Sequence, residues 1–273
     1  MRLENGWKKN SEEVWVLSSV FVIIIIIIAI ASIYLQICYK GGVGSLNCRR
    51  VSGSLKQIDA GNGQVFGVNS ANKIYTLYSG TWTQLSGSLK HVSVGPAGVW
   101  GVDANNYIHR LNHGDWVPVN GESEINQVDA GGMISPAGVN MNDYIYCLQG
   151  GQASSWTSLP GRLKYYSCGP NSCWGVSSGN QIYIMKGVTS NTCAGSLNWE
   201  NVSGALSMIE VSTDGKVYGV NSSGDIFARN HFNQPYRTGW RQVPFRQKVK
   251  HVSYDLGHLW VIGTDNSIMD CTE

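Results

Sequence analysis

The chain has 273 residues, a formal net charge of +2 and only 14% charged residues, while glycine, tyrosine and tryptophan occur 33, 13 and 10 times. This composition is typical of short strands joined by tight turns, and it excludes a disordered chain and a mainly helical one. The basic residues of the folded part are scattered rather than gathered into a stripe, so we expect no nucleic-acid partner.

The N-terminal segment differs from the rest of the chain. A polar leader at 1–13 is followed by Val14–Ile37, which carries no charge, and by a linker at 38–47. A membrane-spanning helix needs roughly 20 apolar residues, whereas the apolar region of a signal peptide has about 7–15. The length of 14–37 therefore predicts a transmembrane signal anchor. A cleaved signal peptide is the alternative, because Ala29 and Ala31 have the spacing that signal peptidase accepts. A buried core helix is disfavoured, since nothing else in the chain looks helical.

Both interpretations place the residues from about 40 onward outside the cytosol. The protein is then either a single-pass membrane protein with an extracellular or luminal domain, partnered with the membrane through its N-terminal helix, or a secreted protein.

Cysteine usage agrees with this placement. Apart from Cys38, at the end of the apolar segment, the chain has six cysteines, an even number that suits disulfides in an oxidising compartment.

The remainder of the chain is a repeat. One motif ends each of five units: Trp82-Thr-Gln-Leu-Ser-Gly87, Trp116-Val-Pro-Val-Asn-Gly121, Trp156-Thr-Ser-Leu-Pro-Gly161, Trp199-Glu-Asn-Val-Ser-Gly204 and Trp240-Arg-Gln-Val-Pro-Phe245. A second motif, such as Val65-Phe-Gly-Val-Asn69, lies inside each of six units, and an isoleucine follows its last position by five residues: Ile74, Ile108, Ile145, Ile182, Ile226 and Ile268. The repeat length of about 34–43 residues is that of a four-stranded propeller blade.

The sequence therefore predicts an all-β fold, a six-bladed β-propeller over 48–273 with four strands in each blade. In the first blade we expect strands near Lys56–Asp59, Val65–Val68, Ile74–Tyr78 and Trp82–Leu85. The alternation of residues along these segments is of strand type. The predicted blades are 54–87, 88–121, 122–161, 162–204, 205–245, and 246–273 completed by 48–53.

The last blade lacks its own terminal motif. The missing copy is at the other end of the chain, where Cys48-Arg-Arg-Val-Ser-Gly53 matches the pattern with cysteine in place of tryptophan. We therefore expect the N-terminal segment to supply the last strand of the C-terminal blade, which removes exposed sheet edges. Cys48 and Cys271 would then lie on adjacent strands, where a disulfide can close the ring.

Two further disulfides follow from the remaining cysteines. Cys168 and Cys173 flank a hairpin-sized loop, and Cys147 and Cys193 pair by elimination. Six cysteines allow fifteen connectivities, so these pairs are the first choice among several. Two sequons, Asn201-Val-Ser203 and Asn221-Ser-Ser223, predict N-glycosylation of an exported chain.

No catalytic constellation is visible, and we predict that the protein is not an enzyme. The six histidines share no spacing with a nucleophile, and neither a Gly-x-Ser-x-Gly elbow nor the boxes of propeller sialidases occur. Asp59 and Asp129 occupy equivalent Asp-Ala-Gly positions and could converge as a carboxylate pair. The alternative, which we favour, is that each caps a turn by accepting from nearby backbone amides. No metal site is assigned.

Binding of sugars needs different residues. Pyranose rings rest on aromatic side chains, while amides and carboxylates on short loops bond the hydroxyls. Both types recur at fixed positions here, and the candidates are Asn69, Asp103, Asn140 and Asn221 with Trp82, Trp116, Trp156, Trp199 and Trp240. Each type also has a structural interpretation, in which the tryptophans pack between blades and the asparagines form turns. Repetition predicts several weak sites that act through avidity.

These motifs resemble one known family. Val51-Ser-Gly-Ser-Leu-Lys-Gln-Ile-Asp-Ala-Gly61, Val65-Phe-Gly-Val-Asn69 and the Trp82 motif are similar to tectonin β-propeller repeats, most of all those of the fish-egg lectins. The resemblance implies a lectin for N-acetylglucosamine-type sugars and bacterial surface glycans, with a calcium influence, no other cofactor and a role in innate defence. It leaves a homo-oligomer open. The third repeat departs from the pattern at Gly131–Pro136, which puts a site in that blade in doubt. The alternative function is that of a protein-binding propeller scaffold, because tectonin-like propellers also occur in intracellular adaptors.

Overall fold

The structure is a computed structural model that describes residues 46–119, 124–132, 136–148, 156–189, 193–229 and 239–272. Leu46–Glu273 forms one compact unit. The predicted leader, the anchor or signal segment at 14–37 and Cys38 lie outside the described residues. Within the described ranges, no helix has the length and apolar character needed to cross a membrane.

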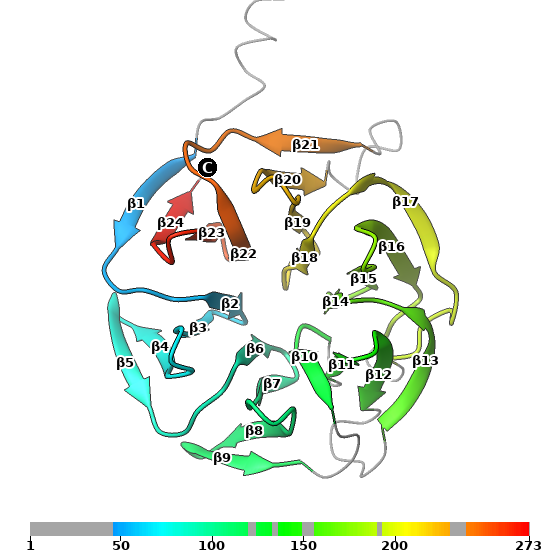
Figure 1. Cartoon of the computed structure of the whole chain (residues 1–273), viewed down its shortest axis with the longest axis horizontal. Helices are drawn as coiled ribbons and strands as arrows, with labels where there is room; N and C mark the ends of the chain where they lie inside the picture. The colour runs from blue at the N-terminus through cyan, green and yellow to red at the C-terminus, as the bar shows by residue number, and fades with distance from the viewer. Residues whose placement is uncertain are drawn as a thin grey trace, which may run out of the picture. The chain divides into compact units, whose positions relative to one another are not determined.

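The described residues form 24 strands in six four-stranded antiparallel sheets, arranged around an axis as the blades of a propeller (Figure 1). Blade 1 comprises β2 (Gln57–Gly61), β3 (Gln64–Val68), β4 (Ile74–Tyr78) and β5 (Thr81–Leu85). Blade 2 comprises β6 (His91–Gly95), β7 (Gly98–Val102), β8 (Ile108–Asn112) and β9 (Asp115–Pro118), and blade 3 comprises β10 (Ile125–Asp129), β11 (Ala137–Asn140), β12 (Tyr144–Leu148) and β13 (Trp156–Arg162). Blade 4 comprises β14 (Tyr165–Cys168), β15 (Ser172–Val176), β16 (Gln181–Lys186) and β17 (Glu200–Ala205), and blade 5 comprises β18 (Met208–Val211), β19 (Val217–Val220), β20 (Ile226–Arg229) and β21 (Trp240–Val243). Blade 6 comprises β22 (Val249–Asp255), β23 (His258–Gly263) and β24 (Ile268–Thr272), with β1 (Asn47–Val51) as its outermost strand.

The predicted ring closure is present. β1 pairs antiparallel with β24, and Cys48 stands opposite Cys271 in the register. A disulfide joins the two residues across a sequence separation of 223. The side chain of Arg49 adds an ion pair to Asp270 at 2.8 Å. The two ends of the propeller are therefore held by a strand pairing, a covalent bond and a charge pair.

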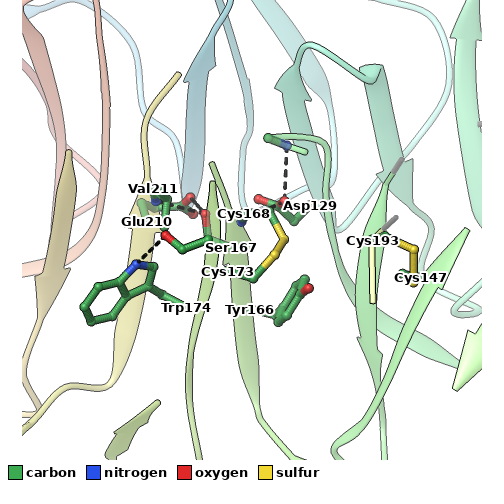
Figure 2. Close-up of a disulfide and its surroundings, with 12 residues drawn as sticks. Asp129, Cys147, Tyr166, Ser167, Cys168, Cys173, Trp174, Cys193, Glu210 and Val211 are labelled. Atoms are coloured by element: carbon green, nitrogen blue, oxygen red, sulfur yellow. Dashed lines mark hydrogen bonds between the residues drawn. A yellow bond between two sulfur atoms is a disulfide. The ribbon is translucent and has the colours of Figure 1, made fainter. Parts of the chain in front are cut away.

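The other two disulfides join the pairs chosen from the sequence. Cys168 is bonded to Cys173 across the β14–β15 hairpin, where the two residues are also register partners. Cys147 of β12 is bonded to Cys193, which follows blade 4's third strand, so this bridge links blades 3 and 4. Figure 2 shows both bridges and the close approach of Asp129 to the strand that carries Cys168.

The hydrophobic core lies between neighbouring blades. Phe66 and Ile74 of blade 1, for example, belong to one buried cluster with Val92 of blade 2. This packing explains the glycine of the inner motif, because a Cβ atom on Gly67 would lie 2.6 Å from Cδ1 of Leu55. Leu89, Leu163 and Leu206 approach Gly101, Gly175 and Gly219 in the same way, at 2.3, 2.2 and 2.6 Å. The recurring glycine thus gives the leucine that enters each blade room to pack.

The turn between the second and third strands also repeats. Its last residue has a positive φ in five blades: Asn72 (60°), Asn106 (69°), Asp143 (65°), Asn180 (62°) and Asn266 (67°). Asparagine and aspartate tolerate this left-handed conformation better than other residues with a side chain. The Asn and Asp of the loops predicted from the sequence therefore have a local structural role.

Candidate functional site

A pocket of about 230 Å³ opens between blade 6 and blade 1. It is lined by Gly53, Ser54, Leu55, Asn69, Tyr75, Trp82 and Ile268. The pocket brings together Asn69 and Trp82, which are both candidate binding residues from the sequence. We call this pocket the blade 6–1 cleft.

Trp82 is held in the cleft by Gly53. The residue lies on β5, and Gly53 follows β1 with a φ of 114°, a conformation that favours glycine. A Cβ atom on Gly53 would lie 3.5 Å from Cδ1 of Trp82. Nε1 of Trp82 is buried and has no hydrogen-bond partner among the described residues. The indole therefore packs against the neighbouring blade while part of it lines the cleft.

The side chain of Asn69 takes part in both the turn and the cleft. Its Oδ1 accepts from the backbone amides of Ala71 and Lys73 at 3.0 and 2.9 Å, which is an Asx-turn. Its Nδ2 faces the hydroxyl of Tyr75 at 3.5 Å, and that hydroxyl donates to Oε1 of Gln84 at 3.2 Å. The turn explains why Asn is placed here, and the amide and phenol leave a polar edge beside the indole.

Tyr75 is a lining residue that the sequence analysis did not select. The signal for it was present, because Tyr75 directly follows the recurring Ile74. The equivalent residues in blades 2 to 6 are His109, Tyr146, Tyr183, Phe227 and Met269. The equivalent strand positions therefore present different side chains, and the blades are not chemically equivalent.

The other candidate tryptophans lie at equivalent positions between blades. Cδ1 of Trp116 and of Trp199 would be 3.1 Å from a Cβ atom on Gly87 and Gly161 of the preceding blade, and the distance from Trp240 to Gly204 would be 3.0 Å. Nε1 of Trp199 donates to the carbonyl of Pro160 at 2.9 Å, and Nε1 of Trp240 donates to that of Ser203 at 3.1 Å. Trp156 is buried, and its glycine partner in the motif, Gly121, lies outside the described residues. These contacts give the tryptophans the packing role that was the alternative interpretation.

The other candidate polar residues form Asx-turns like that of Asn69. Oδ1 of Asp103 accepts from the backbone amides of Asn105 and Tyr107. Oδ1 of Asn140 accepts from the amides of Asn142 and Tyr144. Oδ1 of Asn221 accepts from the amides of Ser223 and Asp225.

Asp103 is distinguished by a charge partner. Its Oδ2 lies 3.1 Å from Nε2 of His109. Burial opposes ionisation of Asp103, but hydrogen bonds from the Tyr107 amide and from His109 outweigh it and lower the pKa of the carboxyl. The blade 2 position is thus an acceptor for ligand hydroxyls, whereas the blade 1 position offers an amide.

Blade 3 has the same residue types as blade 1 but presents them less. Asn140 and Trp156 are 8% and 9% exposed. Part of the departing segment, 133–135, lies outside the described residues. The blade 6–1 cleft combines an indole, an amide and a phenol around one pocket.

Asp59 and Asp129 do not form a catalytic pair at the surface. Both are buried on innermost strands, and their hydrogen bonds cross to the next blade. Oδ2 of Asp59 accepts from Val94 N at 2.7 Å and from Ser93 Oγ at 2.8 Å. Oδ2 of Asp129 accepts from Cys168 N at 3.0 Å, and also from Gly131 N at 3.1 Å. The turn-capping interpretation was therefore incomplete, because these carboxyl groups mainly join inner strands of neighbouring blades.

Burial dominates the chemistry of these acids. It raises the pKa of Asp59, and burial together with repulsion from Asp59 raises the pKa of Asp129 to about 8. Their hydrogen-bonding capacity is used within the protein. The described part of the chain holds no group of three or more His, Cys, Asp or Glu side chains arranged for a metal ion. The calcium influence implied by the resemblance stays a prediction.

The six four-stranded sheets and their shared sequence repeat define a class, the β-propellers built from tandem four-stranded repeats. The family model of the tectonin domain matches residues 54–264. The chain belongs to the tectonin family. The fish-egg lectin of Cyprinus carpio is 56% identical to it over 236 residues, which cover 83% of this chain and 98% of the relative.

Solved structures with the same fold are more distant. A gluconolactonase from Xanthomonas campestris superposes with a TM-score of 0.65 at 9% identity, covering 84% of this chain and 90% of its own. Virginiamycin B lyase from Staphylococcus aureus gives a TM-score of 0.55 at 16% identity, covering 80% and 79%. These likenesses show the propeller fold alone.

Proposed function

We propose that this propeller is a lectin that binds N-acetylglucosamine-type or bacterial surface glycans through several inter-blade clefts, without catalysing a reaction, and serves innate defence. The observation that supports this best is the blade 6–1 cleft, in which an indole lies beside an amide and a phenol. The relation to fish-egg lectin supports a glycan as the ligand.

The cleft has the two elements that a sugar needs. The apolar face of a pyranose rests on the indole of Trp82 and on Leu55. Nδ2 of Asn69 donates to a hydroxyl or acetamido oxygen, and the hydroxyl oxygen of Tyr75, whose proton is donated to Gln84, accepts from a sugar hydroxyl. The volume is below that of pockets for drug-sized ligands, so it suits one sugar ring. Affinity for one ring is then of millimolar order, about −4 kcal/mol.

Binding to a surface gains from repetition. Sites in several blades can engage neighbouring glycans on one cell wall, and the second contact profits from the high effective concentration that the first creates. Because the clefts differ in their polar residues, we expect the blades to contribute unequally.

The disulfides of the propeller favour a location outside the cytosol. Three disulfides hold the propeller, and such bonds persist in oxidising compartments. We therefore propose that the protein is secreted, or that it is displayed extracellularly by an anchor at 14–37. Bacterial surface glycans are reached in either arrangement.

The test uses the full-length chain on immobilised N-acetylglucosamine and on bacterial cells. Free N-acetylglucosamine should compete at about millimolar concentration. Tyr75→Phe and Asn69→Ala should weaken binding, and Asn69→Ala with Asp103→Ala should weaken it more than either alone. Tyr78→Phe is the matched control, because Tyr78 lies on the same strand but is 77% exposed outside the cleft.

A folded chain that ignores both surfaces at every concentration refutes the lectin. A protein-binding scaffold, the alternative, shows binding to bacteria or partners that no sugar inhibits. The Tyr75→Phe variant separates these outcomes, because only sugar binding depends on that hydroxyl.

A further inference from the structure

Lysines recur at one end of the propeller axis. The innermost strands β2, β6, β10, β14, β18 and β22 surround the axis (Figure 1). In four blades a lysine stands at equivalent positions where this strand begins: Lys56, Lys90 and Lys164 directly precede β2, β6 and β14, and Lys250 is the second residue of β22. Equivalent residues of blades that repeat around an axis lie at the same end of it. The four ammonium groups therefore gather at one end, which we call the axial lysine ring.

Each lysine of the ring is held by an asparagine. The Nζ atoms donate to Oδ1 of the asparagine sixteen residues further on, which lies in the left-handed turn of the same blade: Asn72, Asn106, Asn180 and Asn266. Lys90 also donates to Oδ1 of Asn126 at 3.0 Å. All four lysines are partly buried. An ammonium group has three donors, so these bonds orient it and leave N–H groups for a ligand.

Three of the four lysines, Lys56, Lys90 and Lys250, lie close enough for their charges to repel one another. Burial and then repulsion from Lys250 lower the pKa of Lys56. Burial lowers the pKa of Lys90 as well, where Asp103 attracts the ammonium and Lys56 repels it. Asp143 and Asp265 offset part of the charge at Lys164 and Lys250. A hydrogen bond from lysine to asparagine within each blade does not by itself require that four like charges surround one axis. The arrangement therefore favours an anionic ligand.

The side-chain rings of two histidines and one tyrosine lie next to the axial lysine ring along the innermost strands. The next residues along three of these strands are His91, Tyr165 and His251, with ring centroids 6.1 Å apart for His91 and Tyr165 and 6.0 Å apart for Tyr165 and His251. Both nitrogens of His91 and Nδ1 of His251 are buried without a hydrogen-bond partner among the described residues. Burial lowers the pKa of both histidines to about 3, so each ring is neutral and has one N–H donor. The Tyr165 hydroxyl donates to Glu210 at 2.6 Å and lies 2.9 Å from Nε2 of His251, so His251 uses its donor there and His91 keeps a donor for a ligand.

Unpartnered buried nitrogens carry a desolvation cost that a bound group can remove. We propose that the axial lysine ring is an anion site that takes a phosphate group, held by Lys56, Lys90 and Lys250 in front of the His91 and Tyr165 rings. Phosphate fits because it presents oxygens in several directions to point charges that converge from neighbouring blades. The ligand is a phosphorylated sugar or free phosphate, and the site is separate from the blade 6–1 cleft.

The test is calorimetric titration of the full-length chain at low salt. The probes are inorganic phosphate, N-acetylglucosamine 6-phosphate and N-acetylglucosamine. We expect both phosphates to bind, and Lys56→Gln with Lys90→Gln to weaken them at least tenfold without changing N-acetylglucosamine binding. Lys186→Gln is the matched control, since it removes the same charge from β16, where Lys186 pairs with Glu200. Its phosphate affinity should stay within twofold of the parent.

The two phosphate probes identify the source of the ligand. Tighter binding of the sugar phosphate indicates a glycan, whereas equal binding indicates that free phosphate suffices. The single variant Lys250→Gln, expected to lose about threefold, serves if the double variant does not fold. Absence of phosphate binding to the parent at 10 mM, or equal losses in Lys186→Gln and the double variant, overturns the proposal. Because N-acetylglucosamine is measured on the same samples, failure of the cleft and failure of the ring are distinguished.

Discussion

Cys48 and Cys271 face each other on β1 and β24 and are joined by a disulfide, so the first and last described strands of the chain are covalently linked within one sheet. The ring therefore cannot open at its seam without breaking this bond. In a propeller, every blade depends on two neighbours, and an open seam exposes two strand edges.

Replacing both cysteines of the seam by serine should lower the free energy of unfolding by about 2–5 kcal/mol. The matched control is Cys147→Ser with Cys193→Ser, whose bridge closes a sequence separation of 46 rather than 223. The chain-entropy model gives the seam bridge an advantage of about 1 kcal/mol. Urea unfolding measures both, and non-reducing peptide mapping should yield the Cys48–Cys271 pair. Recovery of Cys48 as a free thiol, or bonded to Cys147 or Cys193, would contradict the closure.

Trp82→Ala should lower stability before it lowers sugar affinity. The indole packs against Gly53 of the neighbouring blade, and its removal leaves a cavity that costs about 2–4 kcal/mol for a partly buried side chain. Thermal unfolding measures the loss. Tyr78→Ala on the preceding strand, where the side chain is exposed, should stay within about 0.5 kcal/mol. An unchanged melting temperature for Trp82→Ala would show that the indole of Trp82 contributes to ligand binding and not to stability.

Stability should fall as the pH rises from 7 to 8. Burial raises the pKa of Asp129 to about 8 in the folded state, whereas the unfolded residue ionises near the ordinary aspartate value of 3.8. Over this interval the folded protein binds more protons than the unfolded chain, so the free energy of unfolding decreases by about 1 kcal/mol per pH unit. Burial raises the pKa of Asp59 and Glu210 too, and a raised acid pKa acts on stability in the same direction as the pH rises.

The histidines act in a lower interval. His91 and His251 have folded pKa values of about 3, so they add stability with rising pH only up to about their ordinary value of 6.5. Urea unfolding at pH 7.0 and 8.0 therefore isolates the acids, and Asp129→Asn should flatten the slope. Asp214→Asn is the control, because hydrogen bonds from Ser212 and Lys216 outweigh the effect of burial and keep its pKa low. A parent protein that gains stability over this interval would contradict the protonated state of Asp129.

Glycans are expected on Asn201 and Asn221 when the chain is made in a secretory cell. Asn201 is exposed on β17, and Asn221 begins a surface turn. Mass spectrometry before and after glycosidase treatment measures both. A glycan on Asn221 occupies the blade 5 position that corresponds to Asn69, so Asn221→Gln should not weaken sugar binding. A chain without added mass would count against export.

The number of blades, their four strands and the closing β1 could be predicted from the sequence, because strand pairing within a blade follows the spacing of the repeats. The Ile74–Tyr78 strand has the predicted bounds, while the first strand begins one residue late and ends two residues late, at Gln57–Gly61. The Cys48–Cys271 disulfide followed from the same register, since the two residues are cross-strand partners once β1 completes blade 6. The Cys147–Cys193 pair was assigned only by elimination.

Contacts between blades were decided only by the tertiary structure. Asn69 and Gly53 belong to different blades, and nothing in their spacing shows that they meet at Trp82. Likewise Asp59 bonds Ser93 and Ser253 of its two neighbours, at 2.8 and 2.9 Å, although it sits in a sequence typical of turns. Repeats fix the local hydrogen-bond ladder, whereas the packing angle between sheets and the convergence of inner strands on the axis depend on all six blades together. The cleft and the axial lysine ring exist only in the closed ring.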